Sequence, residues 1–117
     1  MLHQSNKFDM INAMIDTVKI AKALSDPVRH KIMLMLAQNN QECCPVPGEV
    51  EGKTGLCNCE IMAKLGMIQS RVSYHMKELV EAGIVAEEPR GKWKMYFIKT
   101  KTLNQFLEQL RADFKLD

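Results

Sequence analysis

Four cysteines, Cys43, Cys44, Cys57 and Cys59, lie close together in the middle of the chain. Thiolates are soft ligands and no histidine lies nearby, so this set favours a soft ion. Tetrahedral zinc, cadmium or lead would use all four, whereas trivalent arsenic or antimony would use three thiolates in a pyramid. Cys57, Cys59 and one of the Cys43/Cys44 pair could supply those three, with the segment between them closing over the site.

The same thiols allow other interpretations. A closely spaced pair of exposed, low-pKa thiols can sense oxidants or persulfides. A structural zinc site is another alternative, and any one cysteine can be an ordinary core residue. Their density in mostly polar surroundings favours a chemical role.

Spacing limits how Cys57 and Cys59 can cooperate. Residues i and i+2 of a regular helix lie about 200° apart around its axis, so they do not share a face. Binding through both thiols therefore requires Cys57 to precede the helix, or the first helical turn to unwind. Such binding would rearrange the start of the helix, and a ligand shifts a conformational equilibrium only through different affinities for its two states.

The cysteine-bearing helix opens a predicted helix-turn-helix over about residues 58–82, with a turn at Gly66, Met67 and Ile68. The second helix runs from Gln69 to Ala82. Its spacing predicts an inward-facing apolar stripe. The stripe consists of Val72, Met76, Leu79 and Val80.

The rest of that second helix suits DNA recognition. Arginine can contact guanine and glutamine can contact adenine in the major groove, while serine, tyrosine and lysine bind phosphates. The candidate DNA-binding residues are Gln69, Ser70, Arg71, Ser73, Tyr74, His75 and Lys77, with Arg90, Lys92 and Lys94 from the following hairpin. Four glutamates must point away from the DNA for this prediction, namely Glu78, Glu81, Glu87 and Glu88. The alternative is a merely solvated helix.

Other elements position these two sites. Apolar spacing predicts terminal helices over about residues 8–24 and 102–115. A buried helix is expected over residues 27–37, with Asp26 as its N-cap and Pro27 at its first position. Residues 38–56 form a polar, cysteine-bearing insertion. Gly83 is expected to end the second helix of the helix-turn-helix.

The segment that follows predicts a β-hairpin with a basic tip, made of strands at residues 84–88 and 93–98 and a turn at 89–92. The predicted fold is therefore mainly α with a small β-hairpin: a winged helix-turn-helix in a single domain over residues 1–117. The wing spans about residues 84–98. We expect a homodimer in which the terminal helices pair and set two recognition helices about 34 Å apart; the alternative is that these helices fold back on the monomer.

Composition limits the class of protein. A chain of 117 residues suits one domain, and 46% apolar with 26% charged residues is typical of globular proteins. With a net charge of only +2, a DNA-binding surface must come from local clustering. No membrane span or signal peptide is expected, so the sequence predicts a cytoplasmic protein with reduced thiols and no membrane partner. Neither an enzyme nor a binder of small organic substrates is indicated, because no nucleophile–base pair or phosphate loop is present.

Three stretches, in this order, resemble the ArsR/SmtB family of metalloregulatory repressors: ALSDPVRHKIMLML, LCNCEIMAKLGMIQSRVSYHMKELVEAGIV and GKWKMYF. The resemblance covers about residues 21–98. It implies a dimeric winged-helix repressor that binds operator DNA in its apo form and releases it on binding a metal or metalloid. Arsenic-, cadmium- and lead-responsive members carry a Leu-Cys-x-Cys-Asp/Glu motif on this helix, and residues 56–60 match it.

Three departures from the family pattern concern the ligands. Met62 replaces the third cysteine of enteric arsenic-responsive members, and residues 1–42 lack the N-terminal cysteines of cadmium- and lead-responsive members. The last helix has no histidine for the zinc site of other members. We expect the insertion to supply the missing ligand through Cys43 or Cys44. The sequence thus predicts a repressor released by trivalent arsenic or antimony, with cadmium, lead or zinc, and thiol redox or persulfide sensing, as alternatives.

Overall fold

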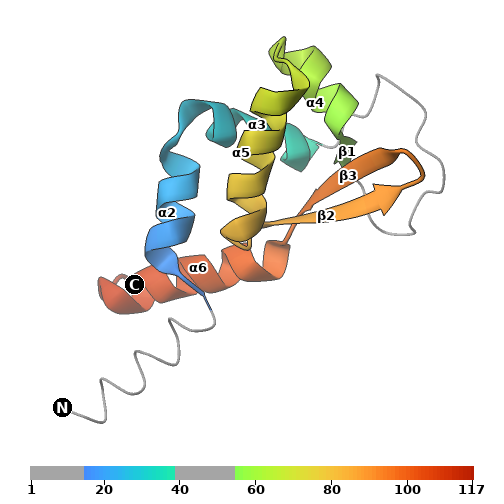
Figure 1. Cartoon of the computed structure of the whole chain (residues 1–117). Coiled ribbons are helices and arrows are strands. Elements are labelled where there is room, and N and C mark those ends of the chain that lie inside the picture. The colour runs from blue at the N-terminus through green and yellow to red at the C-terminus, as the bar shows by residue number, and fades with distance from the viewer. Residues whose placement is uncertain (1–14, 39–54) are drawn as a thin grey trace.

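A computed structural model of the chain describes residues 15–38 and 55–117 (Figure 1). Its elements are α2 (Thr17–Ser25), α3 (Pro27–Gln38), β1 (Leu56–Cys57), α4 (Asn58–Leu65), α5 (Gln69–Glu81), β2 (Val85–Arg90), β3 (Trp93–Ile98) and α6 (Thr100–Asp113). Helices α4 and α5 form the predicted helix-turn-helix, and β2 and β3 form the predicted wing. The chain is a mainly helical winged helix-turn-helix, as the sequence predicts.

The first predicted helix, over residues 8–24, is present from Thr17 onward as α2, but it begins later than predicted. Ile15 and Asp16 are not helical. The cause is capping: the Asp16 Oδ1 atom accepts a 3.0 Å hydrogen bond from the Lys19 amide, which satisfies one of the amides that a helix start leaves unpaired. Residues 8–14 of this prediction lie outside the described residues.

The corner between α2 and α3 follows the sequence prediction. Asp26 caps α3, because its Oδ1 accepts from the Val28 amide at 2.8 Å and from the Arg29 amide at 3.2 Å. Pro27 is the first helical residue. The expected burial of this helix does not extend to Leu34, which is 52% exposed.

Two glycines bound the helix-turn-helix. Gly66 ends α4 at φ 64°, and its amide bonds to the Met62 carbonyl. Gly83 lies just beyond the C-cap of α5 at φ 84°, as predicted. This left-handed conformation is favourable mainly for glycine, so both helix ends are encoded locally.

The sheet holds one strand more than the predicted hairpin. Its order is β1-β3-β2, antiparallel throughout, with Leu56 opposite Tyr96 and Cys57 opposite Met95. The turn is shorter than the predicted residues 89–92: β2 continues through Pro89 to Arg90, which leaves a two-residue turn at Gly91 and Lys92. Pro89 is tolerated because β2 is an edge strand, where a missing amide breaks no ladder on the open side.

A single core joins the helices to the wing. Its fully buried side chains are Ile20, Ile32, Leu36, Leu56, Ile61, Val72, Met76, Leu79, Ile84 and Val85. The predicted stripe of α5 is therefore inside, with Val80 partly buried against the core. No described helix is long and apolar enough to span a membrane.

The last helix packs across the end of this core that lies away from α4 (Figure 1). Phe106 is buried, and Leu103 and Leu110 are partly buried against the core. Leu107 and Phe114, by contrast, are 55% and 70% exposed. The apolar surface of α6 thus exceeds what the monomer covers.

Candidate functional site: a DNA-reading face and a thiol pair

The outer face of α5 carries most of the predicted DNA-binding residues together. Six of them are exposed, namely Gln69, Ser70, Arg71, Ser73, Tyr74 and Lys77. Ile68, which precedes the helix, gives it no side-chain cap. The first amides of α5 are therefore not occupied by a capping side chain, and such a helix start attracts anions.

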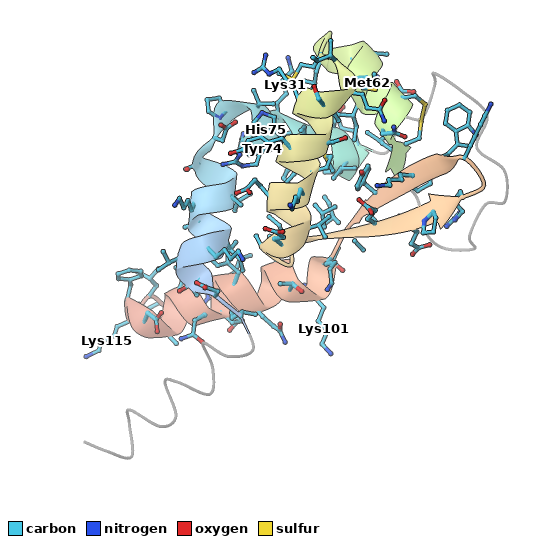
Figure 2. The ribbon with its side chains drawn as sticks, viewed as in Figure 1. Lys31, Met62, Tyr74, His75, Lys101 and Lys115 are labelled. Carbon is cyan, nitrogen blue, oxygen red and sulfur yellow. A yellow bond between two sulfur atoms is a disulfide. The ribbon has the colours of Figure 1, made fainter. Side chains whose placement is uncertain are left out.

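The structure places His75 away from this exposed face, unlike the other six predicted DNA contacts on α5. The side chain is 6% exposed and lies between α5 and the α2–α3 corner (Figure 2). Its position follows from helical spacing, because Val72, His75, Met76 and Leu79 form one i, i+3, i+4, i+7 stripe. That spacing alone indicates that His75 lies on the buried side of α5. The polarity of histidine favoured the opposite prediction.

The partner of His75 is Arg29, a residue that the sequence did not single out. Arg29 is 8% exposed, and its Nη1 lies 3.2 Å from His75 Nδ1. Its Nε donates to the Ala23 carbonyl at 2.8 Å, and Asp26 Oδ2 is 4.0 Å from Nη1. Buried charges need such partners, and this one joins α2, α3 and α5 at a single point.

The three wing cations differ in their environments. Arg90 is largely buried: its Nη2 lies 3.1 Å from Glu88 Oε1, and its guanidinium lies over the Phe97 ring. Lys94 is exposed and lies 3.6 Å from Glu87. Lys92 is exposed at the turn. Glu87 and Glu88, two of the four glutamates that must point away from DNA, are thus paired with cations of the wing itself.

The thiol pair lies where β1 meets α4. Cys57 is the N-cap of α4 in an extended conformation, with φ −81° and ψ 160°, and its sulfur accepts from the Glu60 amide at 3.4 Å. It therefore precedes the helix, as cooperation with Cys59 requires. The Cα atoms of Cys57 and Cys59 are 5.3 Å apart, and a disulfide joins their sulfurs, whereas the sequence predicted reduced thiols (Figure 2).

The pair also contacts the wing. Cys57 is fully buried in a small cluster with Met95 and Phe97 of β3, and Cys59 packs against its edge. The register that sets Cys57 opposite Met95 fixes this contact. Sequence reasoning missed it because β1 has only two residues, too few for any periodicity.

The remaining predicted ligands, Cys43 and Cys44, lie outside the described residues. Within residues 15–38 and 55–117, no three histidine, cysteine or acidic side chains converge as a metal site. Glu60, which follows Cys59, is buried and lies 3.8 Å from Lys64 Nζ. The described part of the site is therefore a sulfur pair beside a partnered carboxylate.

Comparison with known proteins identifies a consistent set of relatives. Residues 51–87 match the family model described as bacterial regulatory protein, arsR family. A Bacillus subtilis protein named arsenical resistance operon repressor is 32% identical over 88 residues, which cover 75% of this chain and 70% of that protein.

Solved structures show the same fold. A crystal structure of an ArsR family transcriptional regulator has a TM-score of 0.64 at 16% identity, covering 84% of this chain and 91% of that one. The homodimeric winged helix-turn-helix domain of a Mycobacterium bovis protein, described as a possible ArsR-family regulator, has a TM-score of 0.60. Its identity is 25%, over 89% of this chain and 85% of that domain.

Proposed function

Because this chain belongs to the arsR family of bacterial regulatory proteins, we propose that it is a repressor that binds operator DNA as a homodimer and leaves it when trivalent arsenic or antimony binds its thiolates. One observation carries the proposal: the sulfurs of Cys57 and Cys59 meet at the start of α4, the first helix of the helix-turn-helix. The name of the Bacillus subtilis relative supports the choice of arsenic.

The chemistry requires the reduced pair. A dithiol reductant of the cytoplasm, where the proposal places this protein, supplies two electrons and two protons: the Cys57–Cys59 disulfide becomes two thiols and the reductant becomes a disulfide. Each thiol that then replaces a hydroxide on trivalent arsenic releases one water. Cys57 and Cys59 provide two of the sulfurs and Cys43 or Cys44 the third. Cadmium, lead and zinc are the other soft ions that this donor set accommodates.

The position of Cys57 supports a route from ligand to DNA. Its sulfur caps α4 through the Glu60 amide, while its backbone pairs with Met95 of the wing. A ligand that draws this sulfur away removes the cap and pulls on β1. The helix-turn-helix and the wing then shift together, which lowers DNA affinity if the two states differ in DNA contact.

The assignment of the DNA-reading surface rests on the exposed face of α5. Arg71 and Gln69 suit guanine and adenine, and the exposed hydroxyl side chains suit phosphates. Exposed apolar side chains on α2 and at α6 could be buried between two subunits of a homodimer. They are Val18, which is 74% exposed, Leu107 and Phe114. The homodimeric Mycobacterium bovis domain supports this assembly.

Fluorescence anisotropy tests the proposal. The reduced protein binds labelled DNA from upstream of its own gene, and arsenite is titrated in. We expect release near stoichiometric arsenite for the wild type and for Met62→Leu, which removes a sulfur from α4 without removing a thiol. Cys57→Ser and Cys59→Ser should bind DNA normally but resist release, since serine can also cap a helix. Normal release of both cysteine variants would contradict the proposal.

The third ligand needs its own comparison. Cys43→Ser and Cys44→Ser are titrated separately, and the variant that loses arsenite response identifies the ligand. If both single variants respond as the wild type does, the double variant decides: loss of response shows that either cysteine can ligate, and normal response shows that this segment does not supply the third thiolate.

The disulfide supports a second candidate, release by oxidation. Two thiols and one hydrogen peroxide yield one disulfide and two waters, with the cysteine sulfurs losing two electrons. A parallel titration with hydrogen peroxide separates the candidates. Release by peroxide, with no response to arsenite, cadmium or zinc, would assign the pair to redox sensing.

A further inference from the structure

We propose that Arg29 is a positioning residue for DNA recognition, which holds α5 against the α2–α3 corner through the neutral ring of His75, so that acidification loosens α5 and weakens DNA binding. The inference rests on the proposed function for its DNA readout. The bond between Arg29 and His75 is a property of the protein alone and is testable without DNA.

Arg29 is bonded on three sides. Its Nε donates to the carbonyl of Ala23 in the last turn of α2, and its backbone amide donates to Asp26. The Nη1 atom reaches His75 of α5 at 3.2 Å. The backbone bond fixes the start of α3. Because the guanidinium is planar and rigid, its own bonds to Ala23 and His75 fix its orientation and thereby the point at which α5 is held.

The bond dictates the protonation state of His75. A guanidinium has donors only, so Nδ1 of His75 must accept and carry no proton, and the ring proton belongs on Nε2. A doubly protonated ring cannot accept this bond and would set a second positive charge beside Arg29. The link therefore exists only while His75 is neutral.

The charged groups around His75 shift its pKa in opposite directions. Asp26 and Arg29 face the ring from the α2–α3 corner, and Arg71, Tyr74 and Glu78 do so from α5 itself. Burial of the ring lowers the pKa of His75 most, and Arg29 and Arg71 lower it further, while Asp26 and Glu78 oppose them. The net pKa is below the ordinary 6.5, so the link is closed at neutral pH and opens only as pH falls through this lowered pKa.

The location of the link makes it relevant to DNA. His75 is one turn beyond Arg71 and directly follows Tyr74, both on the exposed face. A residue held on the inner side fixes the rotation of the helix about its own axis, since successive side chains are about 100° apart. Val72, Met76 and Leu79 also hold this inner side in the core. Opening the link removes the polar contact that adds to them, so the outer side chains keep a less strict alignment with the groove.

Operator affinity at pH 7.5 and pH 5.0 provides the test, with His75→Asn as the decisive variant. The asparagine amide oxygen can accept from Arg29 but does not titrate in this range. We expect wild-type affinity to fall as pH is lowered through the His75 titration, by about tenfold once the ring is protonated, the size of effect that loss of a bond to a charged group produces. His75→Asn should bind like the wild type at pH 7.5 and keep that affinity in acid.

His30→Asn is the matched control, because His30 lies on α3 beside Arg29 but is exposed. It should retain the full pH dependence of the wild type. A wild type that binds equally before and after His75 titrates would overturn the proposal, as would a His75→Asn variant that weakens in acid as much as the wild type does.

NMR of the His75 ring without DNA separates this inference from the proposed function. We expect a proton on Nε2 alone at pH 7.5 and a titration below 6.5 that moves upward in Arg29→Met. A proton on Nδ1 at neutral pH refutes the link whatever the protein does with DNA. Failure to bind any operator, with the expected ring state, refutes the proposed function instead.

Discussion

Gly55→Ala should separate the thiol pair from the wing with a measurable loss of stability. Gly55 is buried just before β1, and an added Cβ would overlap the Tyr96 carbonyl and come within 2.7 Å of Phe97 Cδ1. The carbonyl belongs to the backbone of β3 and cannot swing aside as a flexible side chain does. Either β1 moves away from β3, or β3 moves.

The magnitude follows from two opposing terms. Forcing an extra carbon into a packed site costs about 1–3 kcal/mol, while the stiffer unfolded chain of alanine returns about 0.4–1 kcal/mol. We therefore expect the free energy of unfolding to fall by about 1–2 kcal/mol. For a chain of 117 residues, each kcal/mol lowers Tm by about 4 °C.

Urea denaturation measures this loss, and Gly66→Ala is a useful comparison. Gly66 has open space around its Cβ position but φ 64°, so its loss of stability would come from backbone strain, with the sheet intact. Gly55→Ala should also respond less to arsenite than Gly66→Ala does, because β1 no longer transmits motion to the wing. Wild-type stability and wild-type release in Gly55→Ala would refute the reasoning.

Two further predictions concern single side chains. Arg71→Ala should weaken operator binding by about tenfold or more in an anisotropy titration, with unchanged helical circular dichroism, because one bidentate base contact is worth about 1–3 kcal/mol; unchanged affinity would remove Arg71 from the reading face. The Arg29 amide bond is the main cause that holds the pKa of Asp26 below 3.8, so the stability it contributes is present above pH 3.8 and lost as pH falls through the lower folded pKa. Urea midpoints at pH 5 and pH 2.5 should therefore differ less in Asp26→Asn than in the wild type, and an equal difference would assign the acid response to other groups.

The sequence was most informative where structure is encoded locally. Asp26, Gly66 and Gly83 each predict a helix end, because a cap or a left-handed backbone needs only neighbouring residues. The helix-turn-helix and the wing could be predicted from these helix ends and from the spacing of apolar residues. Asp16 carried the same kind of signal for the start of α2, but the continuous apolar pattern across it obscured the break.

Long-range contacts were the part that the sequence could not provide. The β1–β3 pairing places Cys57 against Met95, and the Arg29–His75 bond joins residues 46 positions apart. Neither contact produces a periodic pattern in the sequence that could predict it. For the DNA face, six of seven candidates on α5 are exposed, while His75 was misplaced because its type was weighed above its position.

The ion pairs of the wing have a consequence for the search of a genome under the proposed function. A cation that already neighbours a carboxylate displaces fewer counterions when it meets a phosphate, so its contribution to nonspecific, salt-sensitive binding is small. Arg90 and Lys94 are in this condition, whereas Arg71 and Lys77 on α5 are exposed. If α5 reads the bases as proposed, we expect the wing to add little to binding of random DNA, so that a larger share of the affinity depends on the bases.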